Sequence, residues 1–319
     1  MSMMTKVIGT TLIATSLLLS GCGSSDSDDS KESSAKKSVS LNFDAVVGDQ
    51  GSVVCSENNV TKVYQNLGST GANGSIADFR FFISEVKLKM KDGTIQEIAL
   101  ENNANQYYDE SNGSIAILDF EDNTGECINR GNDAETYKTI IGEISSDSDI
   151  AGVEFTIGVP IALNHIEFPE ISALTKAKMN WSWAAGRKFT KFEVNPSDEL
   201  NSTGDIFNFH LGSTGCVDND ADGYTDECAQ PNRVTISFDE FDPETQKIVI
   251  DYAELLTYVN IAQDQGGAKG CMSKLDDPEC MSTDGKMFNA IGLDDASQNG
   301  ACLNGDCTMS QRIFSVKSK

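Results

Sequence analysis

The chain has 319 residues, with 24 Lys and Arg against 49 Asp and Glu, so its formal net charge is −25. Nucleic acids and anionic lipid surfaces both recruit basic patches, so this balance argues against a nucleic-acid partner and against electrostatic docking on a membrane. His165 and His210 are the only histidines, which excludes a catalytic zinc site built from three of them. No G-x-S-x-G motif accompanies either histidine, so a common hydrolase is not expected and we predict that the protein is not an enzyme.

The amino terminus has the pattern of an exported lipoprotein. Lys6 precedes a 13-residue apolar stretch, Val7 to Leu19, which is too short to span a bilayer but suits a signal peptide. The stretch ends in Leu-Ser-Gly-Cys22, which resembles the bacterial lipobox, in which the cysteine is diacylated and becomes the new amino terminus. We therefore expect residues 1–21 to be a lipoprotein signal peptide and Cys22 to carry the lipid. An ordinary signal peptide with a coincidental cysteine is the alternative.

The residues after Cys22 predict a location and a tether. Gly23 stands where an aspartate would resemble an inner-membrane retention signal, which favours an outer-membrane lipoprotein facing the periplasm or the cell surface. We expect the lipid to be the protein's only membrane attachment. Residues 22–38 comprise the lipidated cysteine and a segment without an apolar run, which is typical of a flexible tether. Residues 39–319 then form a single domain.

Alternating apolar and polar residues dominate from residue 39 onward, which indicates half-buried strands. Clusters of Gly, Asn, Asp and Ser separate these segments. A short helix is expected at 253–261, and an irregular, disulfide-tied tail at 265–306. The pattern predicts an all-β fold, an antiparallel β-sandwich-like single domain with long disulfide-stapled loops. The expected strands are 39–47, 79–90, 94–100, 115–120, 153–159, 189–194, 206–211, 234–238 and 247–252.

Eight cysteines remain once Cys22 is set aside, an even number that predicts four disulfides in an exported chain. Three pairs are neighbours in sequence, and the two remaining cysteines would close a longer loop, although sequence alone leaves other connectivities open. A thiolate metal cluster is the alternative, and the lack of any C-x-x-C motif argues against it. The suggested pairs are Cys216–Cys228, Cys271–Cys280, Cys302–Cys307 and Cys55–Cys127.

Both tryptophans and both histidines lie in strand-like surroundings. In MNWSW, Met179, Trp181 and Trp183 would share one face of an extended strand, where such residues usually pack into a core. His210 would project from the face opposite its apolar neighbours, and His165 follows a strand-like run and begins a loop. Taken alone, each histidine is more often a surface or hydrogen-bonded residue than a metal ligand.

An ordered set of segments across nearly the whole mature chain resembles the MbnP family. These are periplasmic or lipid-anchored copper-binding proteins, formerly the four-Cys half of a metallo-mystery pair. The resemblance implies a partner similar to the MauG-type dihaem cytochrome c peroxidases, which oxidises a tryptophan of the MbnP protein to kynurenine before copper binds. The segments are LNFDAVVGDQ (41–50), DFRFFISEVKL (78–88), ILDFED (117–122), GVEFTIGVPIALNH (152–165), MNWSWAAGRKF (179–189), FHLGSTGC (209–216), PNR (231–233) and CMSKLDDPEC (271–280).

The donor residues agree with copper chemistry. Imidazole suits copper and thioether suits Cu(I), and with the thiols oxidised the donors reduce to His165, His210 and a few methionines. Opening the indole of a tryptophan creates an aromatic amine and a ketone, which would add a donor to an under-filled site. Trp181 or Trp183 is the expected target, and the sequence does not decide between them. Met179 is the leading auxiliary ligand, with a core role as the alternative.

A second metal motif lies between Cys216 and Cys228. Its D-x-D-x-D-G-x-x-D spacing resembles the calcium loops of thrombospondin type 3 repeats, and alternating carboxylates around a glycine suit a hard cation. The glutamate that closes an EF-hand loop is absent, so a solvated acidic loop is the alternative. The candidate calcium ligands are Asp218, Asp220, Asp222, Tyr224 and Asp226.

Two functions follow from these motifs. The first is an exported copper-binding lipoprotein in copper acquisition or homeostasis, matured by a dihaem peroxidase-like partner. The second is a calcium-stabilised adhesion or cell-surface interaction module in which the histidines and tryptophans are structural. An enzyme with a two-histidine copper centre is the least favoured, because no acid, base or substrate pocket is evident.

Overall fold

A computed structural model describes residues 36–128, 130, 135–165, 170–181, 186–197, 206–221, 225–274, 276–280, 286–293 and 311–319. All of them belong to one of the two units into which the chain divides, Ser34–Lys319. Cys22, Trp183, Asp222, Tyr224, Cys302 and Cys307 lie outside the described residues. Among the described residues, no helix has the length and apolar character needed to cross a membrane.

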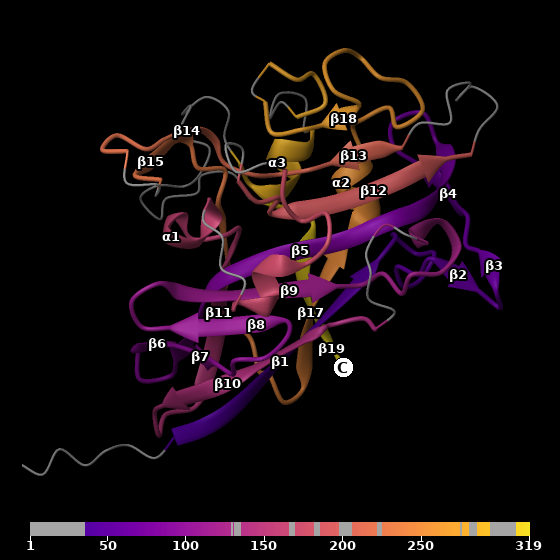
Figure 1. Cartoon of the computed structure of the whole chain (residues 1–319). Helices are drawn as coiled ribbons and strands as arrows, with labels where there is room; N and C mark the ends of the chain where they lie inside the picture. The colour runs from indigo at the N-terminus through magenta and orange to yellow at the C-terminus, as the bar shows by residue number, and fades with distance from the viewer. Residues whose placement is uncertain are drawn as a thin grey trace, which may run out of the picture. The chain divides into compact units, whose positions relative to one another are not determined.

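Five strands form the first of two large sheets (Figure 1). They are β1 (Lys36–Val46), β7 (Ala99–Leu100), β10 (Thr139–Ser145), β17 (Gln246–Asp251) and β19 (Phe314–Ser318). Their order is β19-β17-β1-β10-β7, antiparallel except for β1 with β17. In β1 every second residue from Val39 to Ala45 is buried, as the alternation predicts.

Ten strands form the second sheet: β4 (Tyr64–Leu67), β5 (Ala72–Met90), β6 (Ile95–Glu97), β8 (Gln106–Asp109), β9 (Gly113–Asp119), β11 (Ile150–Ile157), β12 (Thr190–Pro196), β13 (Phe207–Phe209), β16 (Val234–Phe238) and β18 (Gly270–Cys271). Their main order is β16-β11-β5-β12-β13-β18, with β4, β6 and β9 also on β5 and β8 on β9. The 19-residue strand β5 therefore organises this sheet, because five other strands pair with it.

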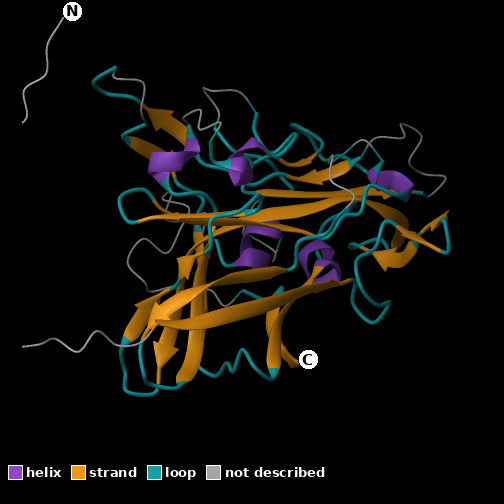
Figure 2. Ribbon diagram, turned by 60° about the horizontal axis from the view of Figure 1, so that its bottom comes forward, coloured by secondary structure: helices purple, strands orange, loops and turns teal. Residues whose placement is uncertain are grey.

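The two sheets pack face to face through aromatic side chains, and Figure 2 shows the two layers of strands. Phe43 of β1 meets Phe155 of β11 edge to face, with ring centroids 5.6 Å apart. Phe314 of β19 meets the same Phe155 at 5.6 Å and Phe81 of β5 at 6.2 Å. Edge-to-face pairs add to the stabilisation that burial of the rings supplies. The all-β, sandwich-like fold predicted from the sequence is thereby confirmed.

Small elements and disulfides complete the unit. The hairpins are β2 (Ser56–Glu57) with β3 (Val60–Thr61) and β14 (Thr214–Val217) with β15 (Glu227–Gln230). The helices are α1 (Ile161–Asn164), α2 (Tyr252–Leu256), α3 (Met287–Ile291) and the 3₁₀ turns η1 (Gly125–Cys127) and η2 (Ser172–Thr175). Three disulfides form as the spacing predicts, namely Cys55–Cys127, Cys216–Cys228 and Cys271–Cys280.

Two local expectations are met only in part. Of the MNWSW segment the structure describes Met179, which follows the turn after η2, Asn180, which makes an isolated antiparallel bridge to Arg187, and Trp181, and none of the three lies in a regular strand. Trp183 lies outside the described residues, so the predicted common face of Met179, Trp181 and Trp183 stays a prediction. The expected helix at 253–261 is α2, which ends at Leu256 because the chain turns there.

Candidate functional site

The second sheet carries its core on one face and buried charges on the other. Successive residues of a strand point to opposite faces, so Phe79 and Phe81 of β5 enter the aromatic core while Asp78 and Arg80 point away from it. Phe79 stacks on Phe192 of β12 with ring centroids 4.2 Å apart. Asp78 and Arg80 are nonetheless 0% and 2% exposed. Charges on this face are therefore as deeply buried as the core.

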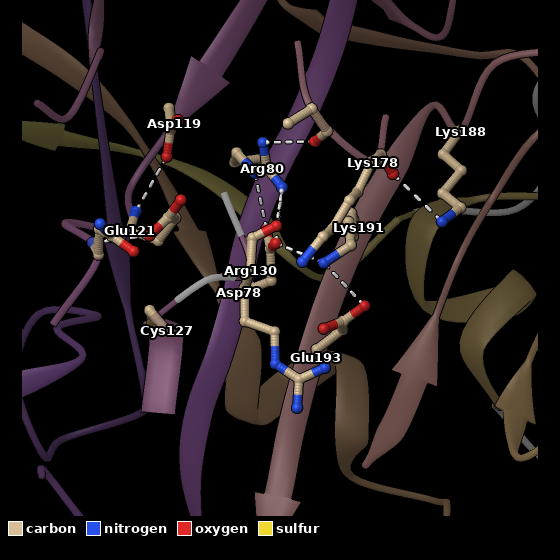
Figure 3. A network of polar contacts seen from close by, with 12 residues as sticks. Asp78, Arg80, Asp119, Glu121, Cys127, Arg130, Lys178, Lys188, Lys191 and Glu193 are labelled. Carbon is tan, nitrogen blue, oxygen red and sulfur yellow. Dashed lines mark hydrogen bonds and ion pairs between the residues drawn. The ribbon is translucent and has the colours of Figure 1, made fainter. Parts of the chain in front are cut away.

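Four of these side chains form a continuous line that we call the charge row: Arg80, Asp78, Lys191 and Glu193 (Figure 3). Arg80 donates to both carboxylate oxygens of Asp78, at 2.9 and 2.7 Å. Lys191 of β12 donates to the same carboxylate and to Glu193, at 2.9 Å from its Oε1. The register places Lys191 opposite Arg80 and Glu193 opposite Asp78. Neighbouring members have opposite charge, which offsets the desolvation of each.

His210 extends the charge row by one strand. It follows β13, on the face where the sequence predicts it, but it is 5% exposed rather than a surface residue. Its Nε2 lies 2.8 Å from Oε1 of Glu193, while its Nδ1 has no hydrogen-bond partner among the described residues. Burial lowers the pKa of His210 against the opposing hydrogen bond to Glu193, so the imidazole is neutral at pH 7. Although burial opposes it, the contacts from His210 and Lys191 lower the pKa of Glu193 to about 2.

His165 is a second buried imidazole. It caps the carboxyl end of α1 and is 6% exposed, and within the described part of the chain neither ring nitrogen has a hydrogen-bond partner. Burial, followed by the nearby Arg187 guanidinium, lowers the pKa of His165, so this ring is also neutral at pH 7. Arg187 fixes the segment by donating to the carbonyl oxygens of Leu163 and Leu174. A neutral imidazole with a free lone pair is the form that ligates a metal.

Trp181 connects the segments that carry the two histidines. Its backbone N–H donates to the Gly186 carbonyl at 3.1 Å, and a Cβ added at Gly186 would lie 2.8 Å from Nε2 of His165. On its other side, a Cβ added at Gly212 would lie 2.8 Å from Cη2 of the indole. Gly212 is two residues beyond His210. At both positions a larger residue would clash, because the backbone lies directly against a side-chain ring.

The structure does not place the other two predicted copper ligands, Met179 and Trp183, beside the histidines. Met179 is 1% exposed and belongs to the hydrophobic core, which supports the core role weighed for it. Trp183 lies outside the described residues, so the structure locates only Trp181. Within the described residues, neither histidine belongs to a cluster of three or more His, Cys, Asp and Glu donors. A metal held by both imidazoles would thus need a donor of another kind.

The charge row and its contact with His210 were not predicted from the sequence. A signal was present: D-F-R-F at 78–81 and K-F-E-V at 191–194 each place two opposite charges on the face of a strand opposite its apolar residues. Alternation of this kind is also typical of a solvent-exposed strand face. Only the pairing of β5 with β12 shows that the charges face each other.

The acidic loop is partly assembled. Carboxylate oxygens of Asp218, Asp220 and Asp226 lie within 4.8 Å of one another, beside the Cys216–Cys228 disulfide of the β14–β15 hairpin. Oδ2 of Asp226 accepts a hydrogen bond from the Asn219 backbone at 2.6 Å. The structure therefore brings together three of the five candidate calcium ligands.

Two further carboxyls lie near the arginine end of the charge row. Burial raises the pKa of Asp119 to about 8 and that of Glu121 to about 7, against the attraction of Arg80. Oδ1 of Asp119 accepts from the Glu121 backbone at 3.1 Å (Figure 3). Both carboxyls bind protons more tightly in the folded than in the unfolded chain.

We predict that Gly212→Ala displaces the Trp181 ring, because the new Cβ and the indole overlap. Overpacking of this kind costs about 1–3 kcal/mol. In a Trp183→Phe background, the fluorescence spectrum of Trp181 should shift and the melting temperature should fall. Asp147→Ala is the control, since the side chain of Asp147 is exposed. An unchanged Trp181 spectrum in folded Gly212→Ala would contradict the contact.

We also predict that Asp119 and Glu121 contribute a stability that falls as pH rises from about 4 to about 8, since each binds more protons in the folded state in this window. The lowered pKa values of His165 and His210 act with the opposite sign, so the contribution of Asp119 is read from the difference between its variant and wild type. Each such carboxyl contributes a slope of up to about 1.4 kcal/mol per pH unit. Asp119→Asn keeps the oxygen that accepts from Glu121 and should make the slope shallower, measured by urea unfolding across the window. Exposed Asp147→Asn is the control. Equal slopes for Asp119→Asn and wild type would refute the raised pKa.

Comparison with known proteins places this geometry in a family. A family model described as MbnP matches residues 36–273. The solved structure of MbnP from Methylosinus trichosporium is similar, with a TM-score of 0.71 and 31% sequence identity over 89% of this chain and 99% of that chain. No curated protein matches the chain. The resemblance read from the sequence is thereby confirmed: the chain belongs to the MbnP family, which is related to a copper-associated system.

Proposed function

We propose that this protein binds copper through His165 and His210, after oxidation of Trp181 to kynurenine by a dihaem partner. The observation that carries the proposal is a pair of buried, neutral imidazoles on segments joined through Trp181. Among the described residues, both ring nitrogens of His165 and Nδ1 of His210 have no hydrogen-bond partner. A buried polar atom without a partner is costly, so such atoms call for an explanation. A bound metal would explain these nitrogens, since it would accept their lone pairs, and imidazole is among the ligands that suit copper.

The incomplete donor set supports the maturation step. Two imidazoles alone leave a copper ion under-coordinated, and an indole offers no lone pair in the ring plane. Kynurenine offers an amine and a ketone. Trp181 is half-buried and lies against Gly212, two residues from His210, which supports it as the modified residue. Lys188 places its ammonium 5.9 Å from the indole centroid, so this ring is also held electrostatically.

The oxidation balances with peroxide as the oxidant. Cleavage of the bond between C2 and C3 of the indole puts one oxygen, taken from water, on each carbon and releases four electrons and four protons. Two molecules of hydrogen peroxide accept these electrons and protons and leave as four molecules of water. Hydrolysis of the resulting formamide releases formate and leaves the aromatic amine. The partner supplies the electron-transfer chemistry, and this chain supplies the indole and its orientation.

We further propose that the protein is an outer-membrane lipoprotein anchored at Cys22, with a role in copper acquisition or homeostasis and no catalytic activity of its own. The lipobox-like sequence supports the anchor.

We predict that copper affinity depends on both histidines and on one tryptophan. After co-expression with the dihaem partner, His165→Ala and His210→Ala should each weaken binding by more than about 100-fold, since changing even an outer-shell residue costs about 10–100-fold. Trp181→Phe should weaken binding, and the matched Trp183→Phe should not. Peptide mass spectrometry should find the loss of one carbon and gain of one oxygen at residue 181.

Two results would contradict this assignment. Full-affinity binding by both histidine variants would remove the copper site, and an unmodified Trp181 in protein from the native host would remove the maturation step.

A second proposal concerns calcium. We propose that the acidic loop of the β14–β15 hairpin binds calcium with the affinity of an extracellular structural site. The clustering of Asp218, Asp220 and Asp226 supports it, since alternating carboxylates suit a hard cation. In this proposal calcium stabilises the hairpin and leaves the copper function to the histidines, which departs from the adhesion module weighed as an alternative.

We predict that about 5 mM calcium raises the melting temperature by about 2–4 °C, if the dissociation constant is near 0.5 mM. Asp220→Ala together with Asp226→Ala should abolish the shift, while exposed Asp147→Ala should preserve it. A wild-type melting curve indifferent to calcium refutes the proposal.

A further inference from the structure

At its Glu193 end the charge row contacts Nε2 of His210, and this contact decides which ring nitrogen carries the proton. Oε1 of Glu193 receives His210 Nε2 at 2.8 Å and Lys191 Nζ at 2.9 Å. A carboxylate next to an ammonium is ionised and only accepts hydrogen bonds. His210 must therefore carry its proton on Nε2 to make the bond.

The other nitrogen of the same ring is left available. In a neutral imidazole one nitrogen is a donor and the other an acceptor, so a proton on Nε2 leaves the lone pair on Nδ1. This atom is buried and has no hydrogen-bond partner among the described residues. His165 differs, because both of its nitrogens are unpartnered there and no carboxylate selects between them.

Glu193 is itself held from two directions. Lys191 bridges Glu193 to Asp78, and Asp78 is fixed by the two hydrogen bonds from Arg80. On the β5 side the pairing with β12 shifts register between Glu193 and Val194, so a bulge lies at this point. Bulges re-aim side chains next to functional sites. The carboxylate oxygen that contacts His210 is therefore also anchored by the Lys191 ammonium.

We propose that Glu193 is a positioning residue, held by Lys191 and Asp78, that fixes His210 as the Nε2–H tautomer and thereby makes Nδ1 its metal-binding atom. This inference rests on the proposed copper function for its consequence, but the tautomer is a property of the metal-free protein. Outer-shell partners of this kind orient metal-binding histidines, and their loss typically costs about 10–100-fold in affinity.

The decisive measurement is nitrogen NMR of the metal-free, ¹⁵N-labelled protein. Only two histidines exist, so the His165→Ala spectrum assigns the ring of His210. In wild type, His210 should show a protonated Nε2 and an unprotonated Nδ1. A proton on Nδ1 instead overturns the inference, and this test needs no substitution at Glu193.

Glu193→Gln separates positioning from simple structural support. The amide both donates and accepts, so the preference of His210 should weaken and its two nitrogen resonances should approach each other, while those of His165 stay in place. Copper affinity after maturation should fall at least about 10-fold. Glu85→Gln is the matched control, because Glu85 is an ion-paired carboxylate of β5 that pairs with Arg233 at 3.0 Å.

The outcomes distinguish the two proposals. Folded Glu193→Gln with wild-type tautomer and wild-type copper affinity overturns the positioning role. If matured wild type binds no copper while the nitrogen spectra behave as expected, the proposed function fails and the control of the His210 tautomer by Glu193 stands.

Discussion

The double ion pair of Asp78 is the interaction on which this side of the molecule depends. Its carboxylate is fully buried and receives both Arg80 and Lys191, whose charges would otherwise be stranded in the same low-dielectric layer. Removing one partner of a buried pair leaves an uncompensated charge and costs several kcal/mol, whereas the intact arrangement is near break-even. Specific geometry, rather than net stability, is therefore what this arrangement contributes.

Strands β5 and β12 contribute both to the aromatic core and to the charge row. On one face, the stacked Phe79 and Phe192 join the aromatic core that holds the two sheets together. On the opposite face, Asp78 pairs with Lys191 and Glu193 contacts His210. Because the two sets alternate residue by residue, a shift of one position in the pairing of β5 with β12 would exchange them. The core thus fixes the register that the charge row requires.

Near the histidines, glycines let the backbone pack closely against side-chain rings. Gly186 lets the ring of His165 approach the backbone, and its φ of +67° suits glycine. Gly212 does the same for Trp181. The two neutral imidazoles are therefore held in different ways. The hydrogen bond between His210 and Glu193 decides which ring nitrogen of His210 is protonated. The packing of His165 against Gly186 fixes the position of its ring but not its tautomer.

The sequence by itself determined the all-β class and the family, because alternation and ordered motifs are properties of neighbours along the chain. It suggested three disulfide pairs that the structure then confirmed. It also placed His210 on the face away from its apolar neighbours. It did not show that Asn180 makes an isolated antiparallel bridge to Arg187, because a contact between two separate residues leaves no trace in the alternation. Tertiary structure alone decided the burial of His210, its contact with Glu193 and the charge row. These depend on which strands lie side by side, and β5 meets β12 across about a hundred residues of sequence.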